Sequence, residues 1–227
     1  MKQIKYPYLN MFTKNNDLVT LGLLPFHLRW FVSEFAGSNS EYYVRYGDNY
    51  QFVHAMDLNT SSYLKLSQDN LLDHLIGRNR IAVPPGLMMK YFSINLLCPK
   101  EQASAYLKII TEGFGIPLIV VTKNSRVYSC CYFLRTLEEK ANIIKAIDYG
   151  LEKILNPEAL QFFKTFPGSV KWFELPFGRG SSLINPISMQ PMKMNKRTMI
   201  EYCIRNQQNT TLTLDKLLHN VEGLSYE

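Results

Sequence analysis

The sequence predicts an α+β fold in which helices flank a mostly antiparallel sheet. Three observations indicate this class. Apolar, β-branched runs of strand length alternate with segments of helical periodicity. Hairpin and turn signals join neighbouring strands. The chain has 227 residues, of which 46% are hydrophobic and 13% aromatic, and this composition is typical of a folded protein with a sizeable core.

Local signals place the elements along the chain. Pro25 and Gly37 bracket one predicted helix, and Ser67 and Gly77 cap another. Thr136-Leu-Glu-Glu139 matches a capping box. In order, we expect a helix over 25–35, a hairpin over 41–53 around a turn at 46–49, a helix over 68–76, strands over 80–83 and 91–97, a helix over 100–114, strands over 118–122 and 127–134, a helix from 136 to 155 with Ala141, Ile144, Ile147, Leu151 and Ile154 facing inward, short strands over 160–164 and 171–175, and one or two C-terminal helices.

These elements predict three regions. Residues 1–40 form an N-terminal arm and helix, residues 41–188 form the main domain, and residues 189–227 form a proline-methionine linker and a helical tail. No run is long enough to cross a membrane, and the N-terminus lacks an apolar signal core, so we expect a cytoplasmic protein. The four cysteines lack metal or redox spacing and are expected to be small buried residues.

The predicted strand over 91–97 carries two small polar residues in an otherwise apolar run. Ser93 and Asn95 lie two positions apart, so both point to the same face of the sheet. In a polymerase-like or nuclease-like palm, two carboxylates at such positions hold divalent metal ions. Neither residue here carries a charge. The net charge of +6 is compatible with nucleic-acid binding but does not establish it.

Four further segments, two before this strand and two after it, form an ordered set of motifs. They are Tyr42-Tyr-Val-Arg45, Leu66-Ser-Gln-Asp-Asn-Leu-Leu-Asp-His-Leu-Ile-Gly77, Gly115-Ile-Pro-Leu-Ile-Val-Val-Thr122 and Leu175-Pro-Phe-Gly-Arg-Gly-Ser-Ser-Leu-Ile-Asn-Pro186. In order and spacing they resemble the archaeo-eukaryotic primase superfamily, especially its primase-polymerase domains of plasmids, viruses and conflict systems. The resemblance covers roughly residues 41 to 187 and implies a primase-like or RRM-like palm.

The departures from the family pattern fall on the motifs that bind its metal ions and the incoming nucleotide. Ser93 and Asn95 occupy the positions of the family's Asp-x-Asp motif. Ser129 or Cys130 stands where the family has a histidine, and Gln161 stands where it has a further acid. Two-metal phosphoryl transfer needs anionic oxygen ligands to hold Mg²⁺ or Mn²⁺. The resemblance therefore implies a catalytically inactive member that holds no metal ion and no other cofactor.

A cleft without carboxylates is more positive and favours DNA, either single-stranded or as a primer-template junction. Cations there would contact phosphates, and aromatic rings would stack on bases. The candidates are Lys123, Arg126, Lys164, Lys171, Arg179, Arg78 and Arg80 for phosphates, and Tyr128, Phe163, Trp172 and Phe177 for bases. Gly178 and Gly180 would admit a phosphate to backbone amides. Each residue also has a structural interpretation, as a solvated cation, a core ring or a hydrogen bond within the sheet.

Three functions follow from the resemblance. The first is DNA binding without catalysis in the replication of a plasmid, virus or mobile element. The second is a scaffold that docks a replicative helicase, polymerase or initiator through exposed methionines near Met189, Met192 and Met194 and the C-terminal helices. The third is an active enzyme whose metal site has moved to Glu174, Asp148 or another carboxylate.

Overall fold

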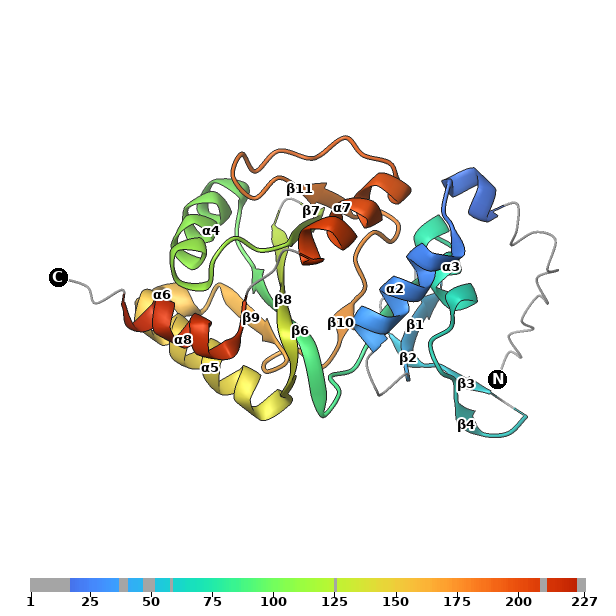
Figure 1. The fold of residues 1–227 in the computed structure, drawn as a ribbon, viewed down its shortest axis with the longest axis horizontal. Coiled ribbons are helices and arrows are strands. Elements are labelled where there is room, and N and C mark those ends of the chain that lie inside the picture. The colour runs from blue at the N-terminus through green and yellow to red at the C-terminus, as the bar shows by residue number, and fades with distance from the viewer. Residues whose placement is uncertain are drawn as a thin grey trace.

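The computed structural model describes residues 17–36, 41–46, 52–57, 59–124, 126–208 and 212–223. Its fold is α+β, as predicted, with helices flanking antiparallel sheets (Figure 1). The described strands form a five-stranded sheet, a four-stranded sheet and a separate two-stranded hairpin. None of the described helices combines the length and the apolar character needed to cross a bilayer.

The larger sheet has the strand order β11-β7-β8-β6-β9. Its members are β6 (Met88–Leu96), β7 (Ile119–Asn124), β8 (Val127–Glu139), β9 (Phe163–Phe166) and β11 (Ser182–Ile184). The predicted polar-bearing strand is therefore β6, an inner strand with β8 on one side and β9 on the other. Burial of both faces explains why the run over 91–97 is so apolar.

Helices cover one face of this sheet. They are α4 (Lys100–Phe114) and α5 (Lys140–Ile154), and α8 (Leu214–Glu222) packs against both. On this face the rings of Phe92 and Tyr132 stack with centroids 4.9 Å apart, and Phe114 of α4 lies near both. Gly150 lets α5 approach α4 closely, since a Cβ at this position would lie 2.5 Å from Phe114 Cζ.

The smaller sheet has the order β10-β5-β1-β2. Its members are β1 (Tyr43–Tyr46), β2 (Val53–His54), β5 (Asn79–Val83) and β10 (Phe173–Glu174), and the hairpin of β3 (Met56–Asp57) and β4 (Ser62–Tyr63) lies beside it (Figure 1). The predicted hairpin joins β1 to β2, and most of its predicted turn at 46–49 lies outside the described residues, which resume at residue 52. Val44, Ile81 and Phe173 are buried on the inner face, so the outer face carries Tyr43, His54 and Arg45.

Helix α2 (Pro25–Ala36) joins the two sheets. Its Phe35 ring lies 5.1 Å from Tyr91 of the larger sheet and 5.7 Å from Phe173 of the smaller one, centroid to centroid. The hydroxyl of Tyr91 also donates to the backbone O of Phe35 at 3.3 Å. Helix α3 (Gln68–Ile76) packs on α2 and on β5. The four-stranded sheet is thus fixed to the larger sheet through an aromatic cluster.

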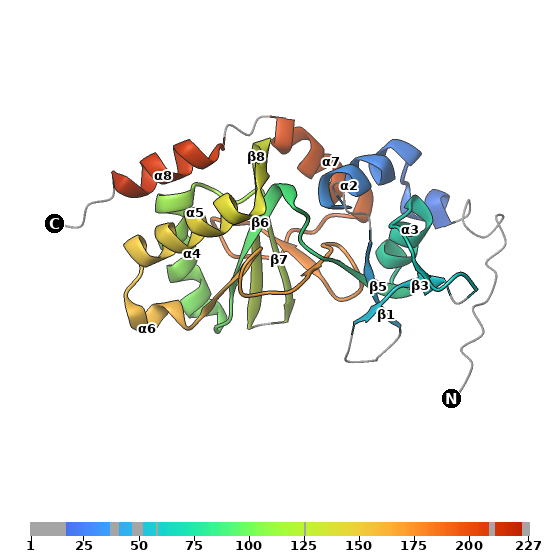
Figure 2. The same cartoon turned by 90° about the horizontal axis from the view of Figure 1, so that it is seen from below.

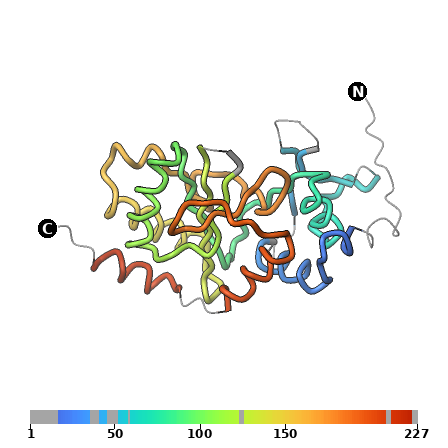
Figure 3. The backbone as a smooth tube through the Cα atoms, turned by 90° about the horizontal axis from the view of Figure 1, so that it is seen from above, coloured from blue at the N-terminus to red at the C-terminus, as the bar shows by residue number. Residues whose placement is uncertain are grey.

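Three helices form a row along one side of the molecule. Figures 2 and 3 both show α8, α7 (Lys196–Gln208) and α2 in succession on this side. Residues of all three helices, including Phe31, Ile200 and Leu217, belong to the same buried cluster as the sheets. The segments predicted as an arm and as a tail therefore contribute side chains to the core of the main domain.

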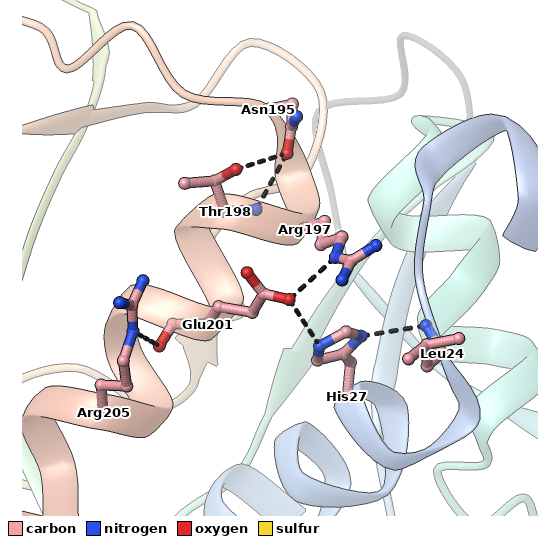
Figure 4. A network of polar contacts seen from close by, with 7 residues as sticks. All are labelled: Leu24, His27, Asn195, Arg197, Thr198, Glu201 and Arg205. Atoms are coloured by element: carbon pink, nitrogen blue, oxygen red, sulfur yellow. Dashed lines mark hydrogen bonds and ion pairs between the residues drawn. The ribbon is translucent and has the colours of Figure 1, made fainter.

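A polar network joins α2 to α7 (Figure 4). His27 is fully buried, and its Nδ1 accepts from the backbone N of Leu24 at 2.9 Å, which caps the start of α2. His27 Nε2 lies 3.5 Å from Glu201 Oε1, and Arg197 Nε donates to the same oxygen at 2.8 Å. Burial lowers the pKa of His27, although Glu201 acts in the opposite direction.

The structure contradicts the predicted capping box and the predicted exposed linker. Thr136-Leu-Glu-Glu139 is not a capping box but the end of β8, and α5 begins at Lys140 without a side-chain cap. Thr136 Oγ1 instead donates to Glu138 Oε1 at 2.7 Å. Residues 189–194 are not an exposed linker, because Met189 is only 3% exposed and Met192 donates its backbone N–H to Leu183 O at 2.8 Å. The four cysteines are buried, as predicted.

Candidate functional site

The inner strand β6 turns Ser93 and Asn95 toward the sheet face opposite α4 and α5. Side chains alternate along a strand, so these two residues share a face while Phe92 points to the helices. The antiparallel register places Ser129 of β8 on one side of Asn95 and Lys164 of β9 on the other. Residues directly opposite each other in neighbouring strands point to the same face, so the four side chains share one surface of the sheet.

Asn95 and Ser129 form a hydrogen-bonded pair at this surface. Ser129 Oγ donates to Asn95 Oδ1 at 2.6 Å, and Asn95 Nδ2 donates to the backbone O of Lys164 at 3.2 Å. Asn95 and Ser129 are half-buried, whereas Lys164 is exposed. We call these three residues, Lys164, Asn95 and Ser129, the polar row. It offers solvent a cation beside two neutral hydrogen-bonding groups.

Ser93 lies further along the same face but does not reach solvent. Its partners in register are Phe166 on β9 and Cys131 on β8, and its side chain is 0% exposed. Among the described residues, its Oγ has no hydrogen-bond partner. A ligand that approaches from solvent therefore meets Asn95 and Ser129, but not Ser93.

Gln161 is not brought together with the other three predicted positions. It is exposed in the turn between α6 (Pro157–Leu160) and β9, and its Nε2 donates to Glu158 O at 2.9 Å. The strand that was expected to start at residue 160 begins only at Phe163. The residue beside Asn95 on that strand is therefore Lys164, a cation rather than a neutral residue.

The side chains on this face do not fit a two-metal site. Asn95 and Ser129 provide neutral oxygens that are already hydrogen-bonded, and Lys164 would repel a cation. Glu174, on the smaller sheet, pairs with Arg80 at 2.5 Å, and Asp148 lies on α5, which covers the other face of the larger sheet. Within the described ranges, no three or more His, Cys, Asp and Glu side chains form a group that could hold a metal ion.

Two of the other predicted DNA-binding residues belong to the turn between β7 and β8 or its edge. Arg126 is exposed there, and the side chain of Lys123 lies outside the described residues.

Tyr128 pairs in register with Leu96, on the side of the sheet that α4 covers, and is only 3% exposed. Burial raises the pKa of its hydroxyl. Tyr128 therefore has no open ring face for a base.

Carboxylates already engage two of the predicted arginines. Arg78 pairs with Asp17 at 2.8 Å and with Asp73 at 3.0 Å, and Arg80 pairs with Glu174. A phosphate at either arginine would have to compete with these ion pairs. Arg179 is exposed, and its Cβ lies 3.0 Å from the position that a Cβ of Gly77 would occupy.

The segments His74-Leu-Ile-Gly77 and Leu175-Pro-Phe-Gly178 pack against each other. His74 is fully buried, its Nδ1 accepts from Ile81 N at 3.1 Å, and its Nε2 lies 3.1 Å from Leu175 O. A Cβ at Gly178 would lie 2.4 Å from His74 Cε1, so glycine is needed for this contact. The Gly178 carbonyl accepts from the Nζ of Lys196, whose pKa is lowered by burial. These contacts give both segments a structural role.

Lys171 and Trp172 belong to the segment between β9 and β10, directly before β10 of the smaller sheet. Trp172 stacks on Tyr43 of β1 with centroids 5.4 Å apart, and Lys171 beside it is exposed. The predicted rings Phe163 and Phe177 are 6% and 1% exposed and belong to the core. The other members of the Trp172 stack were not predicted, because residues 43, 54, 63 and 172 are too far apart in sequence to form a local pattern.

No protein-family model matches the chain, and no curated protein matches it either.

Proposed function

We propose that the protein binds DNA, single-stranded or at a primer-template junction, without catalysing nucleotidyl transfer. In this proposal it is a catalytically inactive primase-like protein that acts in the cytoplasm in the replication of a plasmid, virus or mobile element. The supporting observation is the polar row. Asn95 stands where the resemblance expects a metal ligand, and Ser129 stands near the place of the histidine that would contact the incoming nucleotide. The two neutral side chains are hydrogen-bonded to each other, with the exposed Lys164 beside them.

The chemistry of the row favours holding a phosphate over activating one. Lys164 would neutralise a phosphate oxygen, and such contacts bind any DNA sequence and weaken with salt. The amide and hydroxyl of Asn95 and Ser129 would add hydrogen bonds to phosphate or sugar. Two-metal transfer of a phosphoryl group would require anionic oxygen ligands to hold the metal ions, and neither Asn95 nor Ser129 provides one.

The role of Lys164 in binding can be tested by fluorescence anisotropy with labelled oligo(dT). We expect the wild-type affinity to fall steeply with salt and not to require Mg²⁺. Lys164→Ala should weaken binding and reduce the slope of log affinity against log salt by about 0.7, the value for one contact to a single strand. Lys145→Ala, which changes an exposed lysine of α5 on the helix-covered side, is the matched control and should change neither quantity.

Two results would contradict the proposal. The first is a wild-type protein that does not bind oligo(dT), or binds it independently of salt. The second is template-directed extension of a primer with nucleotides and Mn²⁺, which would show that the protein is a working polymerase. If Glu174→Ala removed that extension, the metal site would be assigned to the smaller sheet instead.

A further inference from the structure

Four aromatic rings form a column on the outer side of the smaller sheet. His54 stacks on Tyr63 with centroids 3.7 Å apart and planes 15° from parallel, and on its other side it stacks on Tyr43 at 4.5 Å and 12°. Trp172 continues the stack beyond Tyr43 at 5.4 Å and 29°. We call these residues, Tyr63, His54, Tyr43 and Trp172, the aromatic column.

The column is assembled from separate parts of the chain. Tyr43 and His54 are opposite each other on β1 and β2, Tyr63 comes from β4 of the separate hairpin, and Trp172 comes from the segment before β10. In Figure 1, β1, β2, β3 and β4 lie together at one end of the molecule. Aromatic side chains contribute much of the packing energy in protein cores and interfaces. Here Tyr63 is 50% exposed and terminates the column at the surface.

Cations surround the column. Lys171 precedes Trp172, and Lys65 follows Tyr63 two residues later, and both are exposed. Arg45 shares the outer face of β1 with Tyr43, and its guanidinium lies 5.4 Å from the centre of the Phe52 ring. Against these three cations stand the carboxylates of Glu41, which lies 3.2 Å from His54 Nε2, and of Asp57 on β3, whereas Glu174 is held by Arg80. One positive charge in excess therefore remains beside the rings.

The rings of the column are stacked, and a nucleobase can stack on an aromatic side chain in the same way. A further flat ring on the outer face of Tyr63 would extend the stack, while Lys65 and Lys171 could hold phosphates along the strand. Only unpaired bases offer a free face, so a single strand suits this surface and a duplex does not.

We propose that the aromatic column binds single-stranded nucleic acid by stacking an unpaired base on Tyr63. This binding site shares no residue with the polar row, and it rests on the proposed function only for the identity of the ligand. The two surfaces would bind different parts of the strand. The polar row would contact phosphates whatever the base, and the aromatic column would contact a base.

The test compares oligo(dT) with an abasic oligonucleotide of equal length, which keeps the phosphates but has no bases. We expect the wild-type protein to bind oligo(dT) at least about fivefold more tightly, the lower end of the effect of one stacking contact. Tyr63→Ala should abolish this preference, and Tyr63→Phe should keep it because the ring remains. Tyr149→Ala, at a half-buried tyrosine of α5, is the matched control and should bind as the wild type does.

The results separate this inference from the proposed function. Equal binding of both oligonucleotides, or an unchanged preference in Tyr63→Ala, overturns the aromatic column and leaves the polar row in place. Absence of oligo(dT) binding by the wild-type protein overturns both. Circular dichroism of each variant confirms that it is folded, and the half-exposed position of Tyr63 makes replacement there tolerable.

Discussion

At the scale of single residues, the contact between His74 and Gly178 shows how two distant segments are fixed together. Both ring nitrogens of His74 have partners inside the protein. Nδ1 accepts from Ile81 N, and Nε2 lies beside Leu175 O and Pro176 O. Since Ile81 N donates to Nδ1, the proton of the neutral ring is assigned to Nε2, where it can be donated to these carbonyls. A buried histidine used in this way is a structural residue rather than a catalyst.

Gly178→Ala should destabilise the protein by about 2 kcal/mol, within the range for overpacking a buried site. The added Cβ would lie 2.4 Å from His74 Cε1, and both residues are buried. Urea unfolding followed by circular dichroism measures the effect. Gly223→Ala is the control, because a Cβ there would meet nothing closer than 3.6 Å, and its stability should change by less than about 0.5 kcal/mol. Equal stabilities of the two variants would contradict the packing described for this contact.

At the scale of elements, the start of α2 depends on a histidine that cannot accept a proton without losing a hydrogen bond. His27 Nδ1 accepts from Leu24 N, so protonation of the ring there would set two N–H groups against each other. Glu201 and Arg197 of α7 face the ring from the neighbouring helix, the first favouring the protonated form and the second opposing it.

The pKa of His27 is lower in the folded protein than its ordinary value of 6.5, so the unfolded chain binds more protons at mildly acidic pH. Its contribution to stability is therefore full above pH 6.5 and falls as the pH drops through and below that value. His27→Asn should flatten this part of the pH dependence, because an asparagine can still cap the helix, as Asn70 does for Ser67 N in α3. Unfolding in urea from pH 7.5 to 5.0 would reveal the change.

The control for this experiment is His219→Asn, which replaces an exposed histidine on α8. Its stability curve should run parallel to that of the wild type over the same pH range. Curves of His27→Asn and wild type that also run parallel would show that His27 does not titrate differently in the folded and unfolded chains.

Most elements could be predicted from the sequence, and the error at 136–139 has a physical explanation. The motif there does match a capping box, but pairing of Met88 with Glu139 and of Met89 with Glu138 extends β8 through it. Pairing with a distant strand is not visible in a local pattern. The buried face of α5 was also misjudged, because Ala146 and Gly150 face inward while Ala141 is exposed. Small residues that admit a neighbouring helix carry little hydrophobic signal.

At the scale of the whole molecule, the C-terminal segment belongs to the core. Met189, Ile200, Cys203, Leu217 and Val221 are each 3% exposed or less. Lys196 also holds the carbonyls of Phe177 and Gly178. Removal of this segment would expose apolar surface on α2, α4 and α5 together.

A chain that ends at residue 188 should therefore lose its cooperative unfolding transition. Replacing one fully buried leucine by alanine already costs about 2–5 kcal/mol, and the truncation removes several such side chains against a total stability of about 5–15 kcal/mol. Near-ultraviolet circular dichroism and urea titration provide the measurement. A truncated chain with an unchanged midpoint would show instead that the segment is a separate tail.

The candidate surface could be predicted only where its residues are local. The alternation of Ser93 and Asn95 is visible within one strand, and both residues do face the same side. Ser129 and Lys164 join Asn95 through strand register, which the sequence does not reveal directly. The aromatic column unites residues from four segments, so it emerges only from the folded chain.

The burial of Ser93 limits the chemistry that this chain could gain by mutation. A carboxylate at that position would be enclosed with Phe166 and Cys131 as neighbours, and it would take up a proton or unfold its surroundings before it met a metal ion. Replacement of both Ser93 and Asn95 by aspartate would thus not be enough to create a polymerase site. The covering layer over residue 93 would have to open first.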